Sequence, residues 1–168
     1  CLSTQAGCKM GCVFCATGKG GFLRDLTAGE ILSQIIAASN DLHCKIQNAV
    51  LMGMGEPLDN FDNVSRFLML AADEQGMNMS SRKITLSTCG LVDKIMPLCD
   101  VNDQITLSIS LHAPNDDIRR KIMPIARKVS FDELMETCKK YIKRTNTRIT
   151  FEYTMIDGVN DSNACAVQ

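Results

Sequence analysis

The chain has 168 residues, of which 45% are hydrophobic, and its formal net charge at pH 7 is −1. This length and composition favour a single globular domain with a sizeable buried core. The chain contains no run of about 18 apolar residues, which a membrane span would require, and its first residues lack the pattern of a secretory signal. We therefore expect a cytoplasmic protein with no membrane partner. A net charge so close to zero gives no general attraction for nucleic acid.

The predicted elements alternate between helix and strand. In chain order we expect a helix over 27–39, a strand over 48–55, a helix over 63–76 that ends on Gly76, a strand over 83–87, a helix over 91–99, a strand over 104–111, a helix over 130–144 and a strand over 148–156. Thr27 with Glu30, and Ser130 with Glu133, have the spacing of capping boxes at two of the helix starts. The alternation predicts an α/β fold built from βαβ units with parallel strands.

Three short motifs stand at the ends of predicted strands. They are GMGEPL at 53–58, STCG at 87–90 and SLHAPND at 110–116. In parallel α/β barrels the loops that follow the strands gather at one face, where the active site is built. We therefore expect the three motifs to meet at one site.

The nine cysteines are unevenly distributed along the chain. Cys8, Cys12 and Cys15 stand close together in CKMGCVFC, whereas five of the others are scattered singly. An odd number of scattered cysteines favours reduced thiols and a metal site over a disulfide framework.

Three cysteines at this spacing can bind one metal centre, but a tetrahedral metal site in a protein normally has four ligands. A structural zinc ion needs four ligands, and the nearest histidine, His43, lies well away at the end of a predicted helix. A four-iron, four-sulfur cube has four irons, so three thiolates leave one iron open to a substrate. The spacing favours such an open cluster, with zinc and unrelated core cysteines as alternatives.

CKMGCVFC matches the CxxxCxxC signature of radical S-adenosylmethionine (SAM) enzymes, including an aromatic residue, Phe14, before the last cysteine. Together with GMGEPL, LSTCG and SLHAPND, it makes essentially the whole chain resemble the RlmN family, the dual-specificity adenine C2-methyltransferases of ribosomal and transfer RNA. The resemblance implies a partial (β/α) TIM-like barrel of the radical SAM type, truncated at both ends. Residues 1–168 would be the radical SAM core domain, without the family's N-terminal accessory domain and C-terminal segment.

The resemblance also implies which residues bind the cofactors. A [4Fe–4S] cluster would have three protein ligands, namely Cys8, Cys12 and Cys15. SAM would chelate the open iron and meet the chain at five further positions: Gly55, Glu56, Ser87, Ser110 and His112. The carboxylate of Glu56 suits the ammonium group of SAM, and glycine lets the backbone approach it closely.

The family's reaction uses two SAM molecules. One methylates a cysteine near the C-terminus, which we expect beyond Gln168. A 5′-deoxyadenosyl radical made from the other takes hydrogen from that methyl group, and the resulting carbon radical adds to C2 of adenine. Cys1 matches a cysteine that resolves the protein–RNA crosslink, the alternative being a thiol buried at a strand end. The implied partners are 23S ribosomal RNA, transfer RNA and an electron donor such as flavodoxin.

Two other functions stay open. The first is a Cfr-like methyltransferase acting on C8 of the same ribosomal adenine, although GEPL and LHAPND are closer to the C2 enzymes. The second is a non-catalytic iron–sulfur or zinc module.

Direct signals for RNA binding are few. Five basic residues follow SLHAPND, namely Arg119, Arg120, Lys121, Arg127 and Lys128. They lack interleaved aromatic residues for base stacking and are typical of a solvated face.

Overall fold

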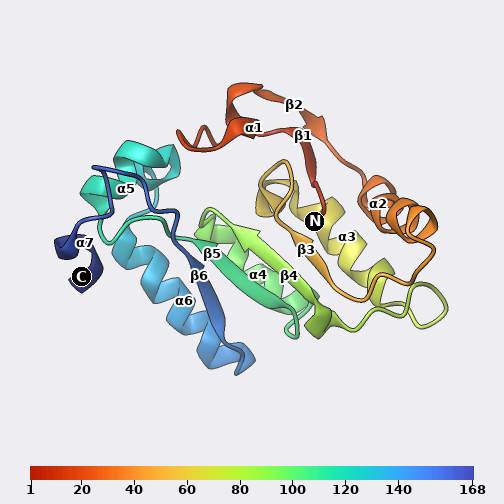
Figure 1. The fold of residues 1–168 in the computed structure, drawn as a ribbon. Coiled ribbons are helices and arrows are strands. Elements are labelled where there is room, and N and C mark those ends of the chain that lie inside the picture. The colour runs from red at the N-terminus through yellow and green to blue at the C-terminus, as the bar shows by residue number, and fades with distance from the viewer.

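The computed structural model describes residues 1–168, which form two sheets and a layer of helices (Figure 1). The main sheet has four parallel strands in the order β3 (Ala49–Leu51), β4 (Ile84–Thr88), β5 (Thr106–Ser110) and β6 (Ile149–Glu152). A separate antiparallel pair consists of β1 (Gln5–Gly7) and β2 (Phe22–Asp25). The predicted α/β class with parallel strands is confirmed, and the main sheet is open rather than closed into a barrel. The antiparallel pair was not predicted.

The longer helices pack side by side along the main sheet. They are α2 (Ala28–Asp41), α3 (Phe61–Ala72), α4 (Val92–Val101) and α6 (Phe131–Thr145). Helix α2 packs on α3, α3 on α4, and α4 on α6. Three short α-helices, α1 (Ala16–Lys19), α5 (Asp116–Ile122) and α7 (Asn163–Val167), and three 3-10 helices, η1 (Pro57–Asn60), η2 (Ser81–Lys83) and η3 (Pro124–Arg127), complete the fold. No helix is both long enough and apolar enough to cross a membrane.

Local chemistry explains where two helices begin. At α2 the predicted capping box forms, since the Thr27 hydroxyl accepts from the Glu30 N–H at 3.2 Å and the Glu30 carboxylate accepts from the Thr27 N–H at 2.9 Å. At α6 only half of the predicted box forms. The Ser130 hydroxyl accepts from the Glu133 N–H at 3.2 Å, and the return bond from Glu133 is missing.

Helix α3 ends at Ala72, four residues before the predicted end at Gly76. The backbone leaves the helical region at Asp73, where ψ is 124°. The Asp73 carboxylate accepts from the Gln75 N–H at 2.8 Å, which is a turn that competes with continued helix. The prediction from glycine alone was therefore wrong.

The main sheet has one apolar and one polar face, because successive side chains of a strand point to opposite sides. Leu86 on β4 and Leu107 on β5 are fully buried in the hydrophobic core that includes residues of the helix layer. The intervening positions carry hydroxyls and a carboxylate: register pairs Ser87 with Ser108, and Ser110 with Glu152. This polar face lines the candidate site.

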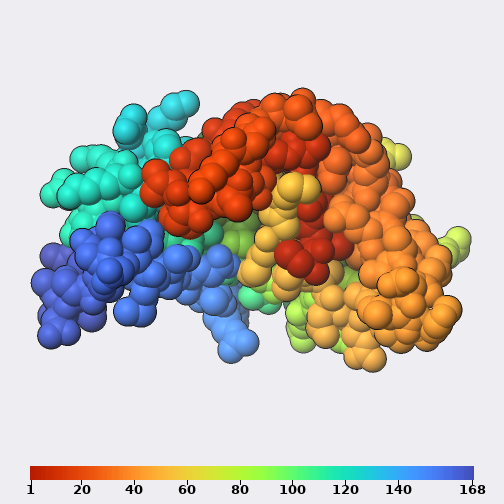
Figure 2. Space-filling model, turned by 45° about the horizontal axis from the view of Figure 1, so that its top comes forward, coloured from red at the N-terminus to blue at the C-terminus, as the bar shows by residue number.

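The N-terminal segment arches over the main sheet and is fixed at both sides (Figure 2). The Leu2 N–H donates to the Val50 carbonyl at 2.8 Å, which ties the start of the chain to β3. At the other side, the Val13 N–H donates to the carbonyl of Ile122, the last residue of α5, at 3.0 Å. The cysteine motif therefore lies in a segment that hydrogen bonds hold to β3 at one end and to α5 at the other.

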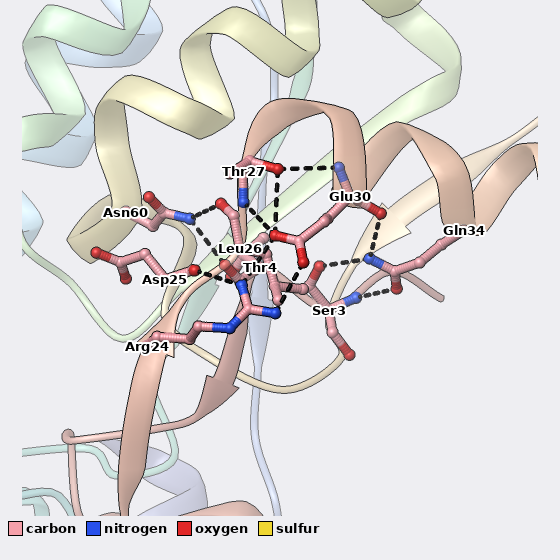
Figure 3. A network of polar contacts seen from close by, with 9 residues as sticks. All are labelled: Ser3, Thr4, Arg24, Asp25, Leu26, Thr27, Glu30, Gln34 and Asn60. Atoms are coloured by element: carbon pink, nitrogen blue, oxygen red, sulfur yellow. Dashed lines mark hydrogen bonds and ion pairs between the residues drawn. The ribbon is translucent and has the colours of Figure 1, made fainter.

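Polar contacts fix the base of this arch to α2 and to the loop before α3 (Figure 3). The Gln34 side chain accepts from the Ser3 N–H and donates to the Ser3 carbonyl, both at 2.9 Å. The Asn60 amide donates to the carbonyls of Thr4 and Leu26 at 2.8 and 2.7 Å. Each contact satisfies backbone groups that lie outside the main sheet.

Candidate functional site

The cysteine motif lies in the loop between β1 and β2. The Cys8 N–H donates to the Gly21 carbonyl at 2.9 Å and closes the base of this loop. Gly7, with a φ of +82°, allows the closure, because a Cβ atom there would lie 1.9 Å from the Gly21 carbonyl oxygen. Cys15 is the N-cap residue of α1, and its N–H donates to the Cys12 carbonyl at 3.1 Å. The loop conformation thus brings the thiols of Cys8, Cys12 and Cys15 to the same side of the loop.

These thiols face a cavity of about 160 Å³ at the carboxyl ends of the parallel strands. Eight of the residues singled out from the sequence line it: Cys8, Cys12, Cys15, Gly55, Glu56, Ser87, Ser110 and His112. The expectation that the three motifs after the strands meet at one site is therefore confirmed. Cys1 does not line the cavity, and its thiol is exposed rather than buried at a strand end.

Glu56 lines the cavity and is buried, with 4% of the residue exposed. Its two oxygens accept from the Cys89 N–H at 2.8 Å and from the Leu58 N–H at 3.1 Å. Burial raises the pKa of Glu56, and these hydrogen bonds act in the opposite direction. The arrangement fixes the carboxylate in place, and a ligand cation would offset the cost of burying it.

Gln5 holds the backbone that carries Glu56. The Glu56 N–H donates to the side-chain amide oxygen Oε1 of Gln5 at 2.9 Å. Gly55 has a φ of +103°, and a Cβ atom at that position would lie 2.6 Å from the Cβ of Gln5. Only glycine lets the loop pass this closely over β1.

Glu152, which was not predicted from the sequence, organises another wall of the cavity. Its Oε1 accepts from the hydroxyls of Ser87 at 2.9 Å and Ser108 at 2.6 Å, and its Oε2 accepts from Ser110 at 3.2 Å. A serine hydroxyl has one hydrogen, so these three oxygens can then only accept further hydrogen bonds. This wall therefore selects ligand groups that donate.

His112 connects this wall with the cysteine loop. Its Nδ1 accepts from the Thr154 N–H at 3.0 Å, which in the neutral ring leaves the hydrogen on Nε2. Burial lowers the pKa of His112 below 6.5, so the ring is neutral at pH 7. The ring packs edge-on against Phe14, with centroids 4.7 Å apart. Asn160, also absent from the sequence prediction, donates to the His112 carbonyl at 2.7 Å and is buried.

A sequence model described as the radical SAM superfamily matches residues 2–166. The chain belongs to the radical SAM superfamily. The chain is 56% identical over 162 residues to the probable dual-specificity RNA methyltransferase RlmN of Clostridium novyi (strain NT), covering 96% of this chain and 47% of the relative. The protein of the same name from Clostridium tetani is 55% identical over 166 residues, which are 99% of this chain and 48% of the relative.

A solved structure gives the same result for the fold. The crystal structure of a radical SAM methyltransferase from Sphaerobacter thermophilus superposes with a TM-score of 0.96 at 46% identity, covering 99% of this chain and 50% of that chain. The chain thus spans about half the length of the relatives it matches.

Radical SAM proteins use a [4Fe–4S] cluster and SAM, and the donor set of the cavity fits both. All three thiols are free. No group of three or more His, Cys, Asp or Glu side chains is arranged to hold a single metal ion. This is compatible with a [4Fe–4S] cluster, because each thiol would bind a different iron and the three sulfur atoms need not converge on one point. Burial raises the pKa of Cys12 to about 11 and also raises that of Cys8, so metal binding would release their protons.

The basic residues that follow SLHAPND in this radical SAM chain do not form one exposed group. Arg119 is completely buried, so the expectation that it lies on a solvated face was wrong. Arg120 is ion-paired with Asp116 at 3.3 Å. Three basic residues remain exposed without such a pair: Lys121, Arg127 and Lys128.

Proposed function

We propose that this chain is the radical SAM core domain of an RNA methyltransferase that modifies C2 of an adenosine in 23S ribosomal RNA and in transfer RNA. The observation that carries the proposal is the cavity in which three free thiols face Glu56 and the serine–Glu152 wall. The similarity to proteins named dual-specificity RNA methyltransferase RlmN supports the substrate class.

In this proposal three thiols, those of Cys8, Cys12 and Cys15, hold the cluster. When bound, a [4Fe–4S] cluster and SAM supply a 5′-deoxyadenosyl radical. Glu56 binds the ammonium group of SAM, because a buried carboxylate with no cation of its own gains a charge-assisted hydrogen bond there.

The remaining polar groups orient the nucleoside part of SAM. Ser87 and Ser110, whose protons are committed to Glu152, accept from ligand hydroxyl or amino groups. His112 donates from Nε2, and its packing on Phe14 closes the cavity beside the cysteine loop. Closure of the cavity by His112 and Phe14 excludes water, which protects a reactive radical.

Cys1 is proposed as the thiol that resolves the protein–RNA crosslink. Its exposure supports this role, since thiol exchange requires access to the attacking sulfur. A protein electron donor such as flavodoxin and a cytoplasmic location stay predictions.

Anaerobic reconstitution with iron and sulfide, followed by electron paramagnetic resonance of the reduced protein, tests the core of the proposal. We expect a four-iron signal that changes when SAM is added. Cys12→Ser should lose the cluster, whereas Cys44→Ser, a change at an exposed thiol outside the cavity, should keep it. Glu56→Gln should keep the cluster and lose most of the response to SAM. A zinc-filled site, or a cluster that ignores SAM, would instead indicate a structural metal module.

A further inference from the structure

Arg119 is the largest fully buried side chain of the molecule and has no counter-ion. Its Nη2 donates to the Cys89 carbonyl at 2.7 Å and its Nε to the Leu111 carbonyl at 3.2 Å, while its Nη1 has no partner. None of the four ion pairs of the structure includes it. An unpaired charge in the interior destabilises the fold, even when it is partly hydrogen-bonded. Its presence therefore needs a physical reason.

The guanidinium lies directly behind the candidate site. Cys89, which accepts from it, lines the cavity. Arg119 is on α5, and the end of the same helix binds the cysteine loop through the Val13 N–H and the Ile122 carbonyl. Burial lowers the pKa of Arg119, and the groups that act in the opposite direction include Cys89, the carboxylate of Asp116 and Cys12. Arg119 thus binds directly to a residue that lines the same cavity as the three thiols.

We infer that Arg119 is a positioning residue whose counter-ion is the iron–sulfur cluster, an inference that rests on the proposed function. Metal binding removes the protons of the cysteine thiols and so places negative charge in the cavity that the guanidinium adjoins through Cys89. One-electron reduction makes the cluster more negative again. A fixed cation stabilises the reduced cluster more than the oxidised one, and so raises the reduction potential.

A purely structural role predicts something different. If Arg119 serves only to join the carbonyls of Cys89 and Leu111, removing it weakens the fold and leaves the potential unchanged. If the cluster is its counter-ion, the metal-free protein carries an unpaired buried charge. An apolar side chain of similar length then leaves the metal-free protein at least as stable.

The test is a redox titration of the reconstituted protein, followed by electron paramagnetic resonance, together with thermal unfolding of the metal-free protein. Arg119→Met removes the charge, and Arg119→Lys keeps it while losing the forked hydrogen bonds. Arg120→Met makes the same change at the exposed neighbouring residue and is the matched control. At the wild-type midpoint, Arg119→Met should show about a tenfold lower ratio of reduced to oxidised cluster, because a unit charge has been removed from a site of low dielectric. Arg119→Lys and Arg120→Met should stay near wild type.

Two results would overturn the inference. One is a wild-type midpoint in Arg119→Met, and the other is a metal-free Arg119→Met protein that unfolds at a clearly lower temperature than wild type. If Arg119→Met takes up no cluster while its metal-free form keeps full stability, the counter-ion role is supported. A wild-type chain without any four-iron signal would contradict the proposed function itself, which the titration reveals before any variant is compared.

Discussion

Replacing Glu152 by alanine removes the acceptor at which three serine hydroxyls meet. The hydroxyl of Ser108 is affected most, because this residue is fully buried and water cannot replace the lost partner. Its only other acceptor is the Thr150 carbonyl at 3.5 Å, at the limit of a hydrogen bond. Ser87 and Ser110 line the cavity, where water can replace Glu152. The loss of stability should therefore come mainly from Ser108.

The magnitude follows from that difference. A buried hydroxyl left without a partner costs about 1–3 kcal/mol. The two hydroxyls at the cavity add little, and removing the carboxylate itself recovers part of the cost of burying a charge. We expect Glu152→Ala to lower the free energy of unfolding by about 2 kcal/mol.

Urea unfolding of four proteins measures this effect: wild type, Glu152→Ala, Ser108→Ala and the double variant. In the wild-type background Ser108→Ala should cost about 1 kcal/mol, because it removes one hydrogen bond. In the Glu152→Ala background the same change should be neutral or stabilising, since it removes an orphaned hydroxyl. Equal costs of Ser108→Ala in both backgrounds would refute the idea that the carboxylate and the hydroxyl act as a pair.

Two further predictions concern the backbone and pH. Gly55→Ala should cost about 2–5 kcal/mol, from a strained positive φ and a 2.6 Å contact with Gln5, whereas Gly29→Ala, with open space around it, should leave the unfolding midpoint near wild type or raise it. The Arg24 guanidinium holds the pKa of Glu30 at about 2, below the ordinary 4.5. The stability that this pair contributes is present above pH 4.5 and is lost as pH falls toward 2, so Glu30→Gln should flatten the acid side of a stability curve measured by circular dichroism. An unchanged acid limb in that variant would contradict the assignment.

The sequence was sufficient to predict the class of fold and most of the candidate site. Apolar runs and a capping box at Thr27 predict elements correctly because both depend on neighbours a few residues away. The antiparallel pair β1–β2 escaped prediction because its strands span only three and four residues and every residue of β2 is exposed. Its closure depends instead on the contact between Gly7 and Gly21.

The residues that were missed act through partners distant in sequence. Glu152 meets Ser87 across 65 positions, and Arg119 meets Cys89 across 30. One local signal did exist for Glu152: polar residues alternate with apolar ones in TLSIS and ITFE, which predicts a polar sheet face. For Arg119 the sequence signal points the wrong way, because a basic residue among others of its kind is normally exposed. Only the packing of α5 under Cys89 reveals its burial.

The charges of the cavity also indicate which form of the ligand it should prefer. Two carboxylates, Glu56 and Glu152, line it together with the cysteine thiols, and no lysine or arginine does. The one histidine, His112, has a pKa lowered by burial and is neutral at pH 7. A ligand with a positive sulfonium should therefore bind more tightly than its demethylated thioether, S-adenosylhomocysteine, by about tenfold or more at low dielectric. Equilibrium dialysis of both compounds against the reconstituted protein measures this ratio. Glu152→Gln, which keeps the shape and removes one negative charge, should reduce the preference, and an unchanged ratio would mean that this carboxylate orders the serines without sensing the charge of the ligand.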